Sequence, residues 1–130
     1  MTEAVEQAAE IINSRGVMSV DLAIVLGDGL GGVVDGLENT IVIPYADLPG
    51  FPEGHSDPDG CLVVADQDGL QVGYMRGRAD FHRTGDAAGM AVPIETLAML
   101  GAQNLIVTAG VGSVRADIHP GNLVLITDHI

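Results

Sequence analysis

The sequence is short of positive charge. It contains five arginines and no lysine against 18 acidic residues, which gives a formal net charge of −13. Because nucleic acids and anionic lipids are bound through basic surfaces, this balance excludes both as partners. The acidity itself is typical of a soluble protein or of a salt-adapted or high-GC host.

Cysteine and long apolar runs are also scarce. The one cysteine, Cys61, lies in the apolar run CLVV, so no internal disulfide is possible and Cys61 is expected to be a small core residue. No apolar run approaches the ~18 residues of a membrane span, and the N-terminus lacks the basic and apolar segments of a signal peptide. We therefore expect a cytoplasmic protein that does not contact membranes.

The rest of the composition indicates one α/β domain over residues 1–130, with 47% hydrophobic residues to build a core. Helical spacing predicts a helix over 3–13, behind Thr2 as N-cap, and a second over 87–101, stopped by Gly101. Short β-prone runs predict six strands, at 22–26, 41–43, 61–65, 70–75, 104–108 and 123–126. The DQDG turn joins the third and fourth strands as a hairpin, which makes the sheet mixed.

The stretch AIVLGDGLGG, residues 23–32, leads from a buried strand into a glycine loop. Gly27, Gly29 and Gly32 match the dinucleotide fingerprint, in which backbone N–H groups approach a pyrophosphate. The eight residues before the next strand are too few for the crossover helix of such a unit. Asp28 also places a negative charge in the loop, so the shape favours an oxyanion and the charge opposes one.

Two further strand ends carry candidate binding residues. YMRGRADFHR, at 74–83, gathers three of the five arginines. Arg78 follows a strand, and its planar guanidinium suits a phosphate or a carboxylate; an ordinary ion pair with a neighbouring aspartate is the alternative. TAGVGS, at 108–113, is a small-residue loop after another strand, at the position where α/β sheets bind ligands.

The histidines and serines form no recognisable metal or hydrolase motif. Neither Ser56 nor Ser113 lies in a Gly-x-Ser-x-Gly elbow, so a serine hydrolase is not indicated. Metal-ligand spacing is absent among the four histidines, which lie on separate loops: His55, His82, His119 and His129. No metal or other cofactor is expected.

Five motifs occur in a recognisable order: IVLGDGLGG, IPYADLPGFP, GYMRGR, LGAQNLIVTAGVG and PGNLVLITDHI. Through them the chain resembles, over about residues 5–130, the N-terminal half of the trimeric purine nucleoside phosphorylase family, which includes methylthioadenosine phosphorylases. The resemblance implies an α/β fold with a mixed sheet, or distorted barrel, flanked by helices. It also implies cleavage of the purine N-glycosidic bond with inorganic phosphate as co-substrate and no other cofactor.

The resemblance places a phosphate loop at Gly27, Asp28 and Gly29, with Arg78 and Asp80 beside it. Arg78 is retained, but Asp28 replaces the family's phosphate-binding serine and Asp80 the histidine of its Gly-Arg-x-His motif. Two donors have thus become acceptors. A phosphate dianion beside two aspartates meets repulsion on the order of 4 kcal/mol per close pair at an effective dielectric near 20. We expect Asp28 and Asp80 to neutralise Arg78 in its place.

Other family positions are altered as well. His82 stands where the resemblance implies a sugar-side tyrosine, and Ala109, followed by Gly110, stands where it implies an asparagine. The family's loop histidine falls on Pro58 when GCLV sets the register, and His55 lies three residues earlier. The catalytic residues therefore stay unassigned, with three candidates: His82, Asp80 and His55.

The family's base-recognising residues belong to a C-terminal half that this sequence does not contain. One interpretation is a purine nucleoside phosphorylase whose activity is impaired or depends on a partner chain that supplies this half. A second is a noncatalytic binding or assembly subunit that pairs with itself or with a full-length homologue through its uncovered last strand. A third is a different enzyme in which Asp28, Asp80 and His82 perform acid–base chemistry. A homo-oligomer or a mixed oligomer is expected.

Overall fold

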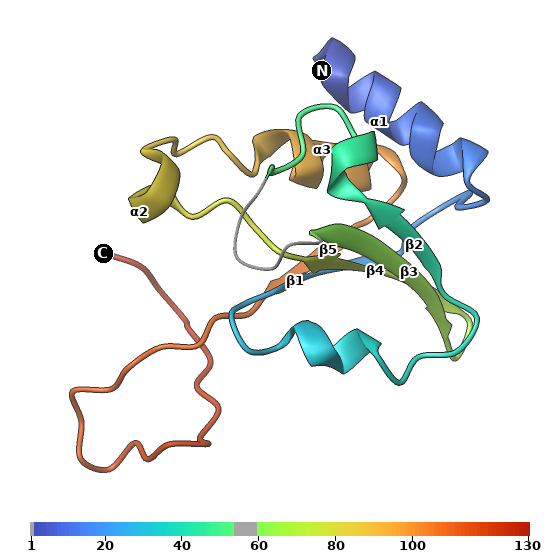
Figure 1. Ribbon diagram of the computed structural model, residues 1–130. Coiled ribbons are helices and arrows are strands. Elements are labelled where there is room, and N and C mark those ends of the chain that lie inside the picture. The colour runs from blue at the N-terminus through green and yellow to red at the C-terminus, as the bar shows by residue number, and fades with distance from the viewer. Residues whose placement is uncertain (1, 54–59) are drawn as a thin grey trace.

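The computed structural model describes residues 2–53 and 60–130. Its centre is a five-stranded sheet with the strand order β2-β3-β4-β1-β5 (Figure 1). β1 pairs in parallel with β4 and β5, whereas β3 pairs antiparallel with β2 and β4. The predicted hairpin and mixed sheet are therefore confirmed. The strands are β1 (Leu22–Leu26), β2 (Ile41–Pro44), β3 (Cys61–Gln67), β4 (Leu70–Arg76) and β5 (Asn104–Val107).

The parallel register brings three strand ends to one edge of the sheet. Leu26 at the end of β1 lies opposite Arg76 at the end of β4, and Val25 lies opposite Val107 at the end of β5. The segments that follow these strands therefore begin side by side. This edge is where ligands of parallel α/β sheets bind.

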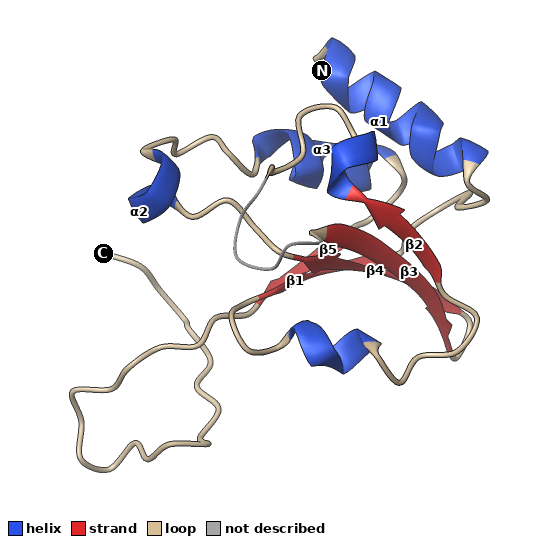
Figure 2. Ribbon diagram, viewed as in Figure 1, coloured by secondary structure: helices blue, strands red, loops and turns tan. Residues whose placement is uncertain are grey.

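The inner strands β1, β3 and β4 are largely buried on both faces, which explains why they are nearly continuous apolar runs. The helices α1 (Glu3–Ser14) and α3 (Ala91–Met99) lie over one face, and the short 3₁₀ helix η1 (Gly31–Val34) lies over the other (Figure 2). Along β3, alternate residues belong to the two separate core clusters: Leu62 and Val64 to one, Cys61 and Val63 to the other. Cys61 is buried, as predicted.

The two predicted helices form with small differences at their ends. Thr2 occupies the N-cap position of α1 but makes no side-chain capping hydrogen bond. The second helix begins at Ala91 rather than at residue 87, because the Asp86 carboxylate accepts the N–H of Ala88 at 2.8 Å and holds the preceding residues in a turn. Gly101, with φ +110°, follows its C-cap as predicted. The short helices η1, η2 (Tyr45–Asp47) and α2 (Phe81–Thr84) were not predicted.

The predicted strand at 123–126 is wrong. These four residues form no strand, and all are exposed, in a segment that runs away from the sheet after β5 (Figure 1). A β-prone run becomes a strand only when a neighbouring strand satisfies its N–H and C=O groups, and within the described residues this run has no such neighbour. No helix in the described part of the chain is long and apolar enough to cross a membrane.

Candidate functional site

The glycine loop after β1 is a tight turn. The N–H of Leu30 donates to the carbonyl of Gly27 at 3.1 Å, which closes a four-residue turn. Gly29, the third residue of this turn, has φ +82°, a backbone conformation that a side chain opposes. The Gly-Asp-Gly sequence is therefore explained by the turn, and the turn leaves Asp28 at its exposed tip.

Thr108 ties the start of this loop to the end of β5. Its hydroxyl accepts the N–H of Gly27 at 3.0 Å and donates to the carbonyl of Val25 at 2.8 Å. A side chain at Gly27 has no space, because an added Cβ would lie 2.6 Å from the carbonyl oxygen of Thr108. The glycine loop and the TAGVGS loop are consequently in direct contact.

Arg78 reaches the same edge from β4. Gly77, with φ +102°, turns the chain after the strand, and its carbonyl accepts the hydroxyl of Tyr45 at 2.8 Å. An Nη1 hydrogen of Arg78 is then donated to the carbonyl of Thr108 at 3.1 Å. Arg78 therefore lies beside both the glycine loop and the TAGVGS loop.

Asp80 also binds Arg78. The Nε hydrogen of Arg78 is donated to Oδ1 of Asp80 at 2.8 Å. The two side chains are only 24% and 11% exposed, so water screens this ion pair weakly. The prediction that Asp80 neutralises Arg78 agrees with this contact.

Asp28 does not share in this ion pair. Its carboxylate is exposed and has no hydrogen bond or ion pair within residues 2–53 and 60–130. Asp28 and Arg78 line the same hollow, but no hydrogen bond or ion pair joins them, so the part predicted for Asp28 in neutralising Arg78 is not seen as a direct contact. Exposure also reduces the repulsion expected between Asp28 and a bound anion, since the effective dielectric is higher there.

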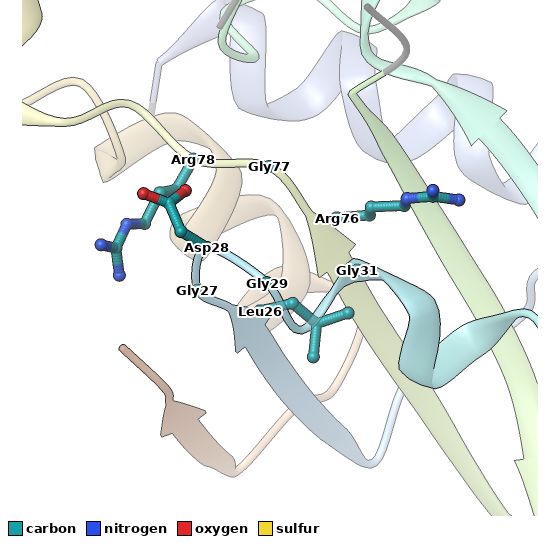
Figure 3. Close-up of a pocket in the computed structure, with 8 residues that line it drawn as sticks. All are labelled: Leu26, Gly27, Asp28, Gly29, Gly31, Arg76, Gly77 and Arg78. Carbon is teal, nitrogen blue, oxygen red and sulfur yellow. The ribbon is translucent and has the colours of Figure 1, made fainter. Parts of the chain in front are cut away.

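A small hollow of ≈ 70 Å³ lies between the glycine loop and the end of β4. This is room for a small anion or a few waters, and is well below the ~300–1,000 Å³ of a drug-sized ligand pocket. Arg76 and Arg78 leave the chain in opposite directions on either side of Gly77 (Figure 3). Arg76 lies 3.5 Å from Asp35, an ion pair on the η1 side of the hollow. The hollow is lined by Leu26, Gly27, Asp28, Gly29, Gly31, Arg76, Gly77 and Arg78.

Of the remaining predicted site residues, some lie against the glycine loop and others do not. Ala109 and Gly110 follow Thr108 against the glycine loop, and an added Cβ at Gly110 would lie 3.5 Å from the carbonyl oxygen of Asp28. His82 lies on the exposed helix α2 and does not line the hollow. His55 falls outside the described residues. Among the residues that the structure describes, no group of three or more His, Cys, Asp or Glu side chains is arranged to hold a metal ion.

Two contacts that support the site were not foreseen. Thr108 and Gly27 are 81 positions apart, and Tyr45 and Gly77 are 32 positions apart. The TAGVGS loop that contains Thr108 was predicted as a candidate site, but the hydrogen bonds of the Thr108 hydroxyl were not predicted. Tyr45 lies in the motif IPYADLPGFP without any local pattern that would mark it as a partner of the β4 end.

The buried Tyr45 predicts a loss of stability in alkali. Burial raises the pKa of its phenol well above the ordinary value of 10.0, and the nearby Cys61 adds to the shift. Because the folded state keeps the proton, Tyr45 contributes stability that is fully present below pH 10 and is lost as the pH rises toward the folded-state pKa. Above pH 10 the free energy of unfolding should fall by about 1.4 kcal/mol per pH unit from this group alone.

Urea unfolding between pH 8 and pH 11 measures this loss. Tyr45→Phe should be less stable than the unsubstituted chain at pH 8, by about 1 kcal/mol for the lost hydrogen bond to Gly77. It should lose less stability than the unsubstituted chain above pH 10. Phe51→Leu, which changes the ring beside Tyr45 and keeps the phenol, is the control and should keep the alkaline slope. Equal slopes in the chain and in Tyr45→Phe would refute this account of Tyr45.

Fold and site together define an α/β protein in which a glycine loop and an arginine meet at the carboxyl ends of three parallel strands. The family model of the Phosphorylase superfamily matches residues 21–130. The chain belongs to this superfamily.

The similar proteins are purine nucleoside phosphorylases. Purine nucleoside phosphorylase 1 of Geobacillus stearothermophilus is 37% identical over 131 residues, which cover 98% of this chain and 47% of the relative. Purine nucleoside phosphorylase 1 of Bacillus subtilis strain 168 is 35% identical over 134 residues, which cover 100% of this chain and 48% of the relative. The resemblance inferred from the five motifs is confirmed. The chain spans about half the length of these relatives.

Solved structures agree with the fold. A purine nucleoside phosphorylase in complex with ribose-1-phosphate matches with a TM-score of 0.80 and 28% identity, over 90% of this chain and 43% of that one. A Schistosoma purine nucleoside phosphorylase in complex with hypoxanthine matches with a TM-score of 0.78 and 28% identity, over 90% and 41% of the two chains. The predicted phosphorylase-like α/β fold is therefore confirmed.

Proposed function

We propose that this chain forms the phosphate-binding part of a purine nucleoside phosphorylase, with activity that is impaired or depends on a partner chain. The observation that carries the proposal is the meeting of the Gly27–Gly29 loop with Arg78 beside a hollow of ≈ 70 Å³. The relatives named purine nucleoside phosphorylase support the reaction class. Inorganic phosphate and a purine nucleoside are the proposed substrates.

The loop offers backbone donors for such an anion. Gly27 already gives its N–H to Thr108, but within the described ranges the N–H groups of Asp28 and Gly29 have no hydrogen-bond acceptor. Backbone N–H groups of this kind bind oxyanions, and an arginine beside them adds charge-assisted bonds. We assign these two N–H groups and Arg78 to phosphate.

In the proposed reaction a phosphate oxygen attacks C1′ of the nucleoside. The C1′–N9 bond breaks, and its electron pair leaves on the purine. The purine takes up, through solvent, the proton that the phosphate group gives up, so the products are ribose-1-phosphate and the neutral base. The loop and Arg78 hold the nucleophile in place, which removes the entropic cost of bringing it to the sugar. The candidate His82 lies on exposed α2, so we assign no residue of this chain to protonation of the purine.

Two features support impaired activity. Asp80 binds the Nε hydrogen of Arg78, and the Asp28 carboxylate lies on the loop that would receive phosphate. Dependence on a partner chain is supported by a separate observation: about half of the length of each relative lies outside its alignment with this chain. We propose that groups which hold the purine come from a chain that carries such a part.

An assembly role without catalysis is the second candidate. The outer strand β5 is exposed along its whole length, with Leu105, Ile106 and Val107 at 43%, 48% and 62% exposure. Exposed apolar edge strands pair readily with other chains. A second copy or a full-length phosphorylase subunit is the proposed partner, and sedimentation of the chain alone and mixed with a full-length relative tests it. A folded monomer in both samples would refute this role.

Nucleoside cleavage tests the primary proposal. Purified chain is incubated with inosine or guanosine, with and without inorganic phosphate, alone and with a C-terminal-half chain of the Geobacillus relative. The expected result is release of purine and ribose-1-phosphate that requires phosphate, increases with the added half, and is absent from an Arg78→Ala preparation purified in the same way. Folded protein without turnover in either sample would contradict the proposed reaction and leave the assembly role.

A further inference from the structure

The tripeptide Arg-Ala-Asp occurs twice in the chain, at 78–80 and 115–117. In both copies the Nε hydrogen of the arginine is donated to Oδ1 of the aspartate two positions later, at 2.8 Å in the first and 2.9 Å in the second. The surroundings differ. The side chains of the first pair are 24% and 11% exposed, whereas those of the second are 66% and 64% exposed.

Only the first copy lies at the candidate site. Arg78 lines the hollow beside the glycine loop, and a second of its donors is held by the carbonyl of Thr108 at 3.1 Å. Its Nε hydrogen is held by Asp80. Two of the five N–H donors of this guanidinium are thus occupied by groups of the chain itself.

A carboxylate and a phosphate present the same chemistry to arginine. Both are oxyanions that accept charge-assisted hydrogen bonds from the planar guanidinium. An anion that enters the hollow must therefore displace Oδ1 of Asp80 from Nε, or bind beside a carboxylate that repels it. The low exposure of Asp80 strengthens both effects, because water screens a buried charge weakly.

We propose that Asp80 is a built-in anion that competes with external oxyanions for Arg78 and so sets the anion affinity of the glycine-loop site. The proposal deepens the function proposed above and rests on it. Asp80 is thereby a specificity-determining residue that acts through Arg78. It disfavours a phosphate dianion more than a singly charged anion, since the repulsion grows with the charge of the ligand.

Calorimetric titration with inorganic phosphate tests this role. Asp80→Asn removes the charge but keeps an oxygen that accepts the Nε hydrogen, so Arg78 retains its position. We expect phosphate to bind this variant about tenfold more tightly than the unsubstituted chain, because a charge-assisted competitor has been replaced by a neutral one. Asp117→Asn makes the same change in the exposed copy and should leave the affinity unchanged. Adding Arg78→Ala to Asp80→Asn should abolish the gain.

The outcomes separate this proposal from the proposed function. Equal phosphate affinities for the unsubstituted chain and Asp80→Asn, both lost with Arg78→Ala, would overturn the role of Asp80 and support the anion site. A folded Asp80→Asn that binds no phosphate would overturn both.

A measurement on the unsubstituted chain covers the case in which Asp80→Asn does not fold. The ¹⁵Nε resonance of Arg78 reports its acceptor, and we expect it to shift as inorganic phosphate is added, while the resonance of Arg115 stays in place. An Arg78 resonance that does not move at saturating phosphate would overturn the competition.

Discussion

Arg78→Ala is expected to remove measurable phosphate binding, a loss of about 100-fold, and to destabilise the fold. Deleting a cation that donates charge-assisted hydrogen bonds to a bound oxyanion costs about 3 kcal/mol of binding free energy. The substitution also leaves Asp80, 11% exposed, without the guanidinium that neutralises it. Removing one partner of such a pair costs about 1–3 kcal/mol of stability. Anion binding and folding are therefore both expected to depend on this one side chain.

Calorimetry with inorganic phosphate and urea unfolding measure the two effects of Arg78→Ala. Arg115→Ala is the matched control, because it removes the same cation from the exposed copy of the tripeptide. This control should bind phosphate like the unsubstituted chain and lose at most about 1 kcal/mol of stability, as is usual for exposed ion pairs. Equal phosphate affinities in the two alanine variants would show that Arg78 does not hold the anion.

Gly27→Ala is expected to lower the free energy of unfolding by about 3 kcal/mol. The added Cβ would lie 2.6 Å from the carbonyl oxygen of Thr108 and 2.7 Å from Cα of Ala109, so the ends of β1 and β5 must move apart. The hydrogen bond from the Gly27 N–H to the Thr108 hydroxyl is lost in the same movement. Because Arg78 donates to the carbonyl of Thr108, the anion site is disturbed together with the sheet.

Two other glycines provide controls for Gly27→Ala in urea unfolding. An added Cβ at Gly36 meets nothing within 4 Å, and Gly36 has no positive φ. Gly36→Ala should therefore be neutral or stabilising by up to about 1 kcal/mol. Gly29→Ala also has free space but φ +82°, and should cost about 1–2 kcal/mol from backbone strain alone. A Gly27→Ala variant as stable as Gly36→Ala would contradict the close approach of β1 and β5.

Local pattern predicted all five strands of the sheet and, wrongly, a sixth strand at 123–126. The runs at 22–26, 61–65 and 70–75 are apolar on both faces, and each finds a hydrogen-bonded neighbour that continues the pattern. The run at 123–126 consists only of apolar residues and forms no strand. β-propensity records how a side chain fits a pleated surface, whereas pairing depends on a partner that propensity does not specify. Among the described residues, β5 likewise has no neighbouring strand on its outer side.

The residues of the site that lie at strand ends were predicted from the sequence. The glycine loop and Arg78 were found because each follows an apolar run, and the ends of parallel strands meet. The pairing of Arg78 with Asp80 was foreseen because the two residues are close in sequence. The Thr108 hydroxyl bond to Gly27 was not, since it links residues 81 positions apart. The direction of Asp28 depends on the turn closed by Leu30, which composition alone does not specify.

The acidic site distinguishes this chain from a simple phosphate cradle. The glycine turn and Arg78 suit an oxyanion, as do the N–H groups of Asp28 and Gly29, which have no acceptor within the described residues. Asp80, paired with Arg78, and Asp28 at the rim add negative charge. The backbone therefore favours an anion beside Arg78, and the charges of these two carboxylates oppose it. The proposed phosphate binding is inferred from the shape of the glycine loop, and the proposed impairment is inferred from the charges of Asp28 and Asp80.

Phosphate binding at the Gly27–Gly29 loop beside Arg78 can be followed through the backbone amide resonances of the loop. A ¹⁵N-labelled chain is titrated with inorganic phosphate, with sodium chloride at equal ionic strength as the control. We expect the amides of Asp28 and Gly29 to shift with a saturable dependence on phosphate, and Arg78→Ala to abolish these shifts. Loop resonances that do not move, or that move equally in folded Arg78→Ala, would show that phosphate does not bind between this loop and Arg78.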